Sequence, residues 1–187
     1  PHLRTFNRKF PDIRVETYAD AALLDLTGGD FDLAIDYSNG EYQDFEAQLL
    51  MHETLLPVTS PNYMPDADWN DPAVWQKISL LHDSMPWPDS PRDAEWRYWL
   101  DQCGLNNVSS TRGHYFNRAD MAIAAADAGL GIALARGSLV SEELESGRLI
   151  APFPPVASCC DYYLLVPKGT ADGSSARVLR DWLQTLA

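Results

Sequence analysis

Hydrophobic positions along the chain follow two periods, which predict helices that alternate with short strands. The helical period governs the opening segment, where Leu3, Phe6 and Phe10 share one face before Pro11. Strand-like runs are short and either alternating or wholly apolar, as in FDLAIDY over residues 31–37. We predict helices over residues 3–10, 21–26, 96–103, 117–128, 136–145 and 174–186, and strands over residues 13–18, 31–37, 78–81, 111–116, 131–135, 148–152 and 159–166.

The most strongly patterned stretch is NRADMAIAAADAGLGIALARG, residues 117–137. Its alanine-rich apolar face predicts a helix that ends where Gly129 and Gly131 follow, and an apolar strand begins there. Asn117 and Asp120 are the expected N-terminal caps of this helix. Free N–H groups and the positive end of the helix dipole then favour an anion beside the helix start.

Two extended segments predict that the chain crosses twice between two lobes. Residues 49–58 are extended, with a break expected at Pro57, and the strand near residues 160–166 returns. The fold class predicted is therefore α/β, with two crossover strands and a cleft between the lobes. Lobe I is predicted at residues 1–56 and 163–187, and lobe II at residues 57–162.

Polar residues at the ends of predicted strands are the candidate ligand groups. Asp20 and Asp36 lie at such ends, where open α/β sheets bind their ligands. His82 and Asp83 follow the strand predicted at residues 78–81. Because no second metal ligand or proton-transfer partner stands near this pair, a polar contact to a small molecule is favoured over catalysis.

Two arginines beside the central helix are candidates for holding a carboxylate. Arg118 precedes the helix, and Arg136 follows the strand after it. A guanidinium grips a carboxylate with two N–H groups, whereas the alternative role is a salt bridge, which an acidic chain offers readily. Of the two, we favour Arg118 as a ligand group.

Three further sets of side chains have open roles. Tyr162 and Tyr163 alternate across the return strand, so that one faces the core and the other faces away. Trp87 stands between two prolines and could form the wall of a pocket. Cys159 and Cys160 are interpreted as small strand residues rather than as a redox sensor.

Composition and charge narrow the classes of function. The 187 residues are 45% hydrophobic and 22% charged, which is ordinary for a globular protein, and no apolar run nears the ~20 residues that span a bilayer. The net charge of −13 repels a phosphate backbone, so this segment is not expected to bind DNA by itself. Three cysteines make a poor disulfide framework, and no leader precedes the first helix; both favour the cytoplasm.

Sequence motifs of enzymes are missing from the chain. It contains no GxSxG, GxxxxGK[ST], HExxH or CxxC pattern. We therefore predict no catalytic residues, no metal and no cofactor, and the chain is not expected to be an enzyme.

Six stretches, in order along nearly the whole chain, resemble the effector-binding domain of LysR-type transcriptional regulators. They are LRTFNRKFPDIRVE, GGDFDLAI, LLPVTSPNY, FNRADMAIAAADAGLGIALARGSLV, GRLIAPF and DYYLLVP. Within that family, LLHDSMPW, AEWRYWL and FNRADMAI are most similar to the branch of the glycine-cleavage activator, the β-lactamase regulator and the D-serine deaminase activator.

The resemblance implies a two-lobed fold like that of type 2 periplasmic binding proteins, with a small effector between the lobes. It also implies homodimers or tetramers that bind DNA through an N-terminal helix-turn-helix outside this sequence, with no membrane contact. The family's usual first strand would precede Leu3 and is not in this sequence, which implies an unfilled place in the first sheet. The effector-binding residues implied are Asp20, His82, Asp83, Asn117, Arg118 and Tyr162.

The leading hypothesis is a sensor of a small metabolite, with an amino acid such as D-serine as the expected effector. The helix start or Arg118 would hold the carboxylate, and Asp20 or Asp83 would hold the ammonium group. The alternative is a periplasmic solute-binding protein of a transporter, which shares the fold.

Overall fold

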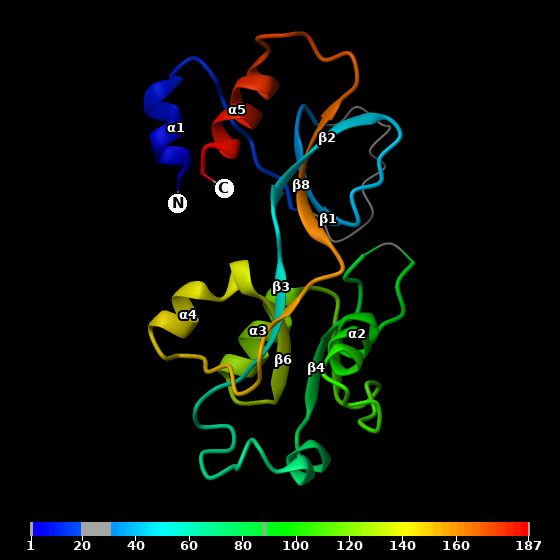
Figure 1. The fold of residues 1–187 in the computed structure, drawn as a ribbon. Coiled ribbons are helices and arrows are strands. Elements are labelled where there is room, and N and C mark those ends of the chain that lie inside the picture. The colour runs from blue at the N-terminus through cyan, green and yellow to red at the C-terminus, as the bar shows by residue number, and fades with distance from the viewer. Residues whose placement is uncertain (1, 20–30, 88, 187) are drawn as a thin grey trace. The chain divides into compact units, whose positions relative to one another are not determined.

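The computed structural model describes residues 2–19, 31–87 and 89–186, which form two compact units (Figure 1). Unit 1 comprises Pro1–His52 and Cys159–Ala187, and unit 2 is the single stretch Glu53–Ser158. Unit 1 contains α1 (Leu3–Lys9), β1 (Ala34–Ser38), β2 (Phe45–Met51), β8 (Asp161–Pro167) and α5 (Ser175–Gln184). Unit 2 contains β3 (Thr54–Val58), η1 (Pro72–Gln76), β4 (Leu80–Asp83), α2 (Ala94–Gln102), β5 (His114–Phe116), α3 (Ala119–Asp127), β6 (Ile132–Arg136), η2 (Gly137–Leu139), α4 (Ser141–Glu145) and β7 (Val156–Ala157).

The sheet of unit 1 has β8 at its centre, in the order β1-β8-β2, with both pairings antiparallel. Leu165 of β8 is fully buried and forms a small core with Ala34 and Phe45. Elsewhere in this unit, Phe6 of α1 lies 5.0 Å from Trp182 of α5 between ring centroids. Burial of these aromatic rings fixes the two terminal helices side by side, as Figure 1 shows.

The sheet of unit 2 has the order β5-β4-β6-β3-β7, with β4 parallel to both of its neighbours. Alternation along the strands places consecutive residues on opposite faces, and each face has its own core. Leu80 packs with α2 and a group of tryptophans, whereas Leu81 packs with α3. Helices therefore cover both faces, and the carboxyl ends of β4, β5 and β6 lie at one edge of the sheet.

Most of the predicted helices and strands are confirmed. The helices predicted at residues 3–10, 96–103, 117–128 and 174–186 are α1, α2, α3 and α5, and the strand predicted at residues 131–135 is β6. At the end of α3, the N–H of Leu130 donates to Ala125 O and that of Gly129 to Ala126 O, which is the hydrogen-bond pattern of a glycine-terminated helix.

Four predicted features are wrong. Residues 13–18 form no strand, because no described strand pairs with them. Pro57 does not break β3; it lies within that strand, beyond the two residues that pair with β7. Residues 148–152 make a single bridge, between Ile150 and Thr59. The helix predicted at residues 136–145 starts later, because Arg136 ends β6 and the buried Val140 interrupts the helical backbone between η2 and α4.

The predicted caps of the central helix are also wrong. Arg118 is the N-cap of α3, and no side chain accepts a hydrogen bond there. Asp120 lies in the first helical turn instead, where its carboxylate accepts hydrogen bonds from Arg118. The helix predicted at residues 21–26 lies outside the described residues.

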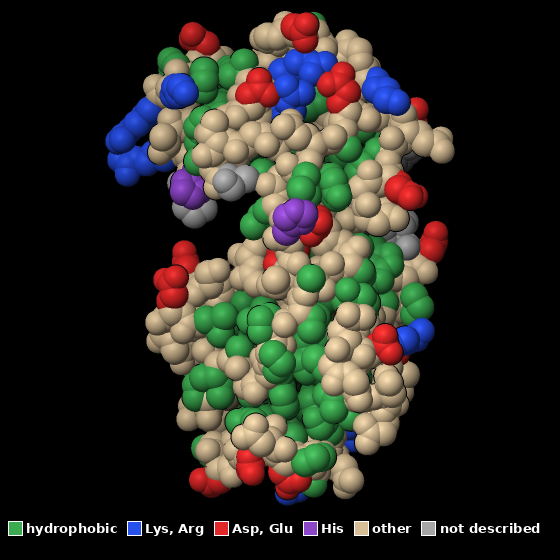
Figure 2. Space-filling model, in the orientation of Figure 1, with side chains coloured by type: hydrophobic (Ala, Val, Ile, Leu, Met, Phe, Trp, Pro, Cys, Tyr) green, Lys and Arg blue, Asp and Glu red, His purple; other side chains and the backbone are tan. Residues whose placement is uncertain are grey.

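Charged side chains of both signs are mixed on the face shown in Figure 2. In unit 1, Nη1 and Nη2 of Arg177 donate to the two carboxylate oxygens of Glu46, each at 2.8 Å.

No helix in the described part of the chain is both long and apolar enough to cross a membrane.

Candidate functional site

The carboxyl ends of β4 and β5 bring four of the predicted site residues to one region of unit 2. His82 and Asp83 of β4 lie opposite Tyr115 and Phe116 of β5. The N–H of Ser84 then donates to Phe116 O at 2.7 Å, so the two chains leave the sheet side by side. Asn117 and Arg118 follow directly on β5, and the region at the end of these two strands is the candidate site.

Asp83 belongs to a buried cluster of three charges with Arg136 and Glu95. Nη2 of Arg136 lies 3.2 Å from Asp83 Oδ2 and 3.2 Å from Glu95 Oε1. The side chains of Arg136, Asp83 and Glu95 are only 11%, 6% and 4% exposed. Oδ1 of Asp83 also accepts the N–H of Met85 at 3.0 Å. Two carboxyl groups therefore share one guanidinium near the strand ends.

His82 is almost completely buried and lies within a stack of rings. Its imidazole lies 4.3 Å from the Tyr115 ring with 13° between their planes, and the Arg92 guanidinium lies 4.3 Å from the same tyrosine ring. Nε2 donates to Arg112 O at 2.9 Å, so the neutral ring carries its proton on Nε2. Nδ1 is buried and has no hydrogen-bond partner in the described part of the chain. Burial lowers the pKa of His82, and the hydrogen bond to Arg112 opposes only part of this effect.

The stability of the protein is expected to fall as the pH drops below about 6.5, because the pKa of His82 is lowered in the folded state. An unfolded histidine takes up its proton near pH 6.5, whereas the folded state keeps His82 neutral to a lower pH. The stability associated with the neutral ring is therefore complete above about pH 6.5 and declines by up to about 1.4 kcal/mol per pH unit below it. Chemical denaturation of His82→Phe, which keeps a ring against Tyr115, should show a smaller slope over this window.

His114→Gln provides the matched control for this measurement, because His114 is exposed on the neighbouring strand. It should keep the slope of the parent protein. An equal slope in the parent protein and in His82→Phe would contradict the role assigned to His82.

Arg118 and Asn117 are exposed at the start of α3. Nε and Nη2 of Arg118 donate to the two carboxylate oxygens of Asp120 at 2.9 and 3.1 Å. These bonds hold the pKa of Asp120 below its usual range. The backbone N–H groups of Asp120 and Met121 contribute to this lowered pKa, so the Asp120 carboxylate already lies among the first N–H groups of α3.

The other two predicted site residues, Tyr162 and Asp20, are not among the described residues of unit 2. Tyr162 is on β8 of unit 1, half-buried, with its ring 5.2 Å from that of Tyr37. Its neighbour Tyr163 is also half-buried and packs against Tyr42 at 6.1 Å. Asp20 lies outside the described residues. The participation of all six predicted residues in effector binding stays a prediction.

Two members of the buried charged cluster, Arg136 and Glu95, are not among the predicted site residues. The sequence favours Arg118 over Arg136 as a ligand group, yet Arg136 is buried in the charged cluster. The position of Glu95 on the helix contained a signal, because Glu95 lies four residues before the buried Trp99 and thus on the same apolar face. A charged residue on a buried helix face needs a partner of opposite charge.

No group of three or more His, Cys, Asp or Glu residues that could hold a metal occurs among the described residues.

Comparisons with known proteins give consistent matches. The model of the family described as "LysR substrate binding domain" matches residues 1–187. The chain is 33% identical to the glycine cleavage system transcriptional activator of Escherichia coli (strain K12), covering 98% of this chain and 58% of that protein. It is 32% identical to the HTH-type transcriptional regulator DsdC of the same strain, covering 90% and 55%. The chain thus spans little more than half the length of these relatives.

Solved structures show the same fold over the whole chain. The effector-binding domain of AmpR from Citrobacter freundii is similar with a TM-score of 0.83 and 26% identity, covering 100% of this chain and 89% of that one. The effector domain of AmpR from Pseudomonas aeruginosa gives a TM-score of 0.82 at 25% identity, covering 100% and 87%.

Proposed function

This chain belongs to the LysR substrate-binding domain family, and we propose that it senses a small effector through the candidate site and thereby regulates an attached DNA-binding domain. The observation that carries the proposal is the match of the family model over residues 1–187. The relatives compared above are transcriptional regulators, and none of them supports the alternative of a transporter's solute-binding protein. The predicted two-lobed α/β fold agrees with the likeness to effector domains.

The expected effector is an amino acid, and the charges of the candidate site suit its two ionic groups. The start of α3 and the Arg118 guanidinium, some of whose N–H groups already bind Asp120, offer N–H donors to a carboxylate. The carboxyl groups of Asp83 and Glu95 favour an ammonium group nearby. D-Serine is our first candidate, from the resemblance of the sequence to the D-serine deaminase activator branch. Asn117, His82, Asp20 and Tyr162 are proposed as further contacts.

A thermal-shift screen tests this function. D-Serine, L-serine, glycine, other amino acids of both hands and small organic acids would each be added to the protein. A ligand at 100 times its dissociation constant stabilises the protein by about 2.7 kcal/mol, which gives a clear rise in the melting temperature. We expect stabilisation by one amino acid or a close relative, and weaker binding of it by Arg118→Ala.

Arg148→Ala is the control variant, because Arg148 is another exposed arginine in unit 2 that pairs with a carboxylate, that of Glu143 at 2.8 Å. It should bind the effector like the parent protein. Unchanged affinity in Arg118→Ala would remove Arg118 from the site, and no stabilisation by any compound would contradict the sensing function of this chain.

The longer regulator is proposed to supply the remaining activities. We infer that it binds DNA through a helix-turn-helix outside this sequence, forms homodimers or tetramers, acts in the cytoplasm and catalyses no reaction. The net charge of −13 supports a division of labour in which this segment stays off the DNA backbone.

A further inference from the structure

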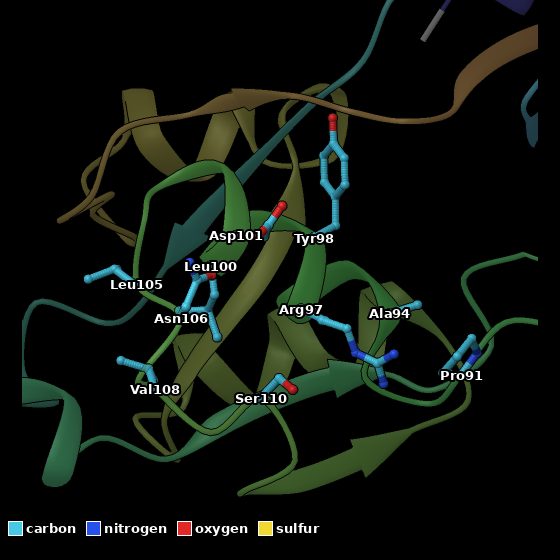
Figure 3. A pocket seen from close by; sticks show the side chains of 10 residues that line it. All are labelled: Pro91, Ala94, Arg97, Tyr98, Leu100, Asp101, Leu105, Asn106, Val108 and Ser110. Atoms are coloured by element: carbon cyan, nitrogen blue, oxygen red, sulfur yellow. The ribbon is translucent and has the colours of Figure 1, made fainter.

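A groove runs along α2 in unit 2, and its lining residues are separate from those of the candidate effector site (Figure 3). It has a volume of about 580 Å³, which is within the usual range for small-molecule sites. One side is formed by residues at the start and along the outer face of α2, and the other by the segment of residues 105–110. None of these residues belongs to the candidate effector site, so the groove could bind a second ligand.

Arg97 is held in the groove by a buried carboxylate. Its Nη2 donates to Asp93 Oδ1 at 2.7 Å, and Ser110 Oγ donates to the other oxygen, Oδ2, at 2.6 Å. The Arg97 side chain is 60% exposed, whereas that of Asp93 is only 8% exposed. Burial alone would raise the pKa of Asp93, but the hydrogen bonds from Ser110 and Arg97 outweigh it and the pKa lies below its usual value. The carboxylate therefore stays ionised and anchors the guanidinium.

The anchored guanidinium keeps donors for a ligand. An arginine has five N–H donors, and Asp93 accepts from only one terminal nitrogen of Arg97. The hydrogen bond to Asp93 already fixes the orientation of the planar guanidinium. When a carboxylate binds the remaining donors, the Arg97 side chain therefore loses little further rotational freedom.

Asp101 provides the opposite charge one helical turn further along α2. It lies four residues after Arg97, a spacing that places the two Cβ atoms about 5–6 Å apart on one helix face. Asp101 is exposed and makes no ion pair with any residue that the structure describes. A cation and an anion on the same helix face can contact the carboxylate and the ammonium group of one amino acid.

Apolar side chains form much of the rest of the lining. Pro91 and Ala94 lie at one end, near Arg97, and Leu105 and Val108 lie at the other (Figure 3). Contact with such a surface stabilises an apolar side chain by about 25 cal/mol for each Å² removed from water. A polar side chain such as that of serine would gain little here.

We propose that this groove binds a zwitterionic amino acid with a large apolar side chain, such as phenylalanine or leucine, as a second ligand site of the protein. Arg97 binds its carboxylate, Asp101 binds its ammonium group, and Leu105 and Val108 contact its side chain. The chain's net charge of −13 disfavours a simple anion, whereas a zwitterion has no net charge to repel.

Calorimetric titration with L-phenylalanine tests the proposal. We expect saturable binding that weakens about tenfold or more in Arg97→Gln and in Asp101→Asn, since each change removes one hydrogen bond between charged groups. N-Acetyl-L-phenylalanine lacks the ammonium group, so it should bind the parent protein weakly and be insensitive to Asp101→Asn.

Two control variants identify the site that is titrated. Arg148→Gln changes an arginine that is 54% exposed and paired with a carboxylate, much like Arg97, and it should leave binding unchanged. Arg118→Gln at the candidate effector site should also leave it unchanged. The proposal is overturned if phenylalanine does not bind at about 10 mM, or if binding survives Arg97→Gln and Asp101→Asn.

Discussion

Arg136→Met is expected to destabilise unit 2 by about 3–5 kcal/mol, because it leaves two buried carboxylates without their cation. Asp83 and Glu95 both bind the same guanidinium, and both are buried. Methionine matches much of the arginine's volume, so the loss measures charge rather than a cavity. Denaturation by urea, followed by the fluorescence of the buried tryptophans of unit 2, gives the free energy of unfolding.

A second variant separates the charge effect from damage to packing. Arg136→Met combined with Glu95→Gln removes one of the two carboxylates that bind Arg136, and it should be more stable than Arg136→Met alone. Arg148→Met, at an exposed ion pair, should change stability by less than about 1 kcal/mol. The proposed role of the Arg136 charge in stability would be contradicted if Arg136→Met were as stable as the parent protein. It would also be contradicted if the double variant were less stable than Arg136→Met.

Gly113→Ala is expected to destabilise unit 2 by a similar amount, about 3–5 kcal/mol, through a backbone collision. Gly113 has φ of +105° just before β5, and a Cβ atom there would lie 1.9 Å from the carbonyl oxygen of Leu80. Since β5 pairs with β4 from Leu81 onward, the collision can be relieved only by shifting one of these strands. The variant should therefore also lose affinity for the effector, because His82, Asp83 and the start of α3 depend on this pairing.

Gly104→Ala separates the collision from the cost of a positive φ. Gly104 has φ of +70°, but a Cβ atom there meets nothing within 4 Å. Its loss should stay near the conformational cost alone, about 1–2 kcal/mol. If urea denaturation gave equal losses for the two alanine variants, contact with Leu80 would have no part in the effect.

The sequence predicted best where a local pattern and the tertiary environment agree. The alanine-rich face of α3 and the glycine after it determine a helix and its end with little help from distant residues. Residues 13–18 alternate as clearly as a strand does, but a strand also needs a partner, and sequence periodicity contains no information about pairing. Similarly, the polar residues Asn117 and Asp120 have good capping propensity. The helix α3 nevertheless begins at Ala119, two residues after Asn117, so its N-cap is Arg118.

The candidate site could be predicted in part for a related reason. His82 and Asp83 end β4, and Asn117 and Arg118 follow β5, so the parallel pairing of these strands brings all four to one region; their part in effector binding stays a prediction. Arg118 is exposed, whereas Arg136 is buried in contact with Glu95, which lies 41 residues away in sequence. That contact could not be inferred from the residues near Arg136.

The discontinuity of unit 1 has a consequence for how the protein is made. Unit 2 is one uninterrupted stretch, Glu53–Ser158, so the ribosome delivers all of its two cores before β8 exists. Among the described strands, β1 and β2 each pair with β8 alone, which is synthesised more than 100 residues later. During translation, β1 and β2 therefore lack this pairing partner until unit 2 has been synthesised, and unit 1 is the part of the nascent chain exposed to misassembly and to chaperones.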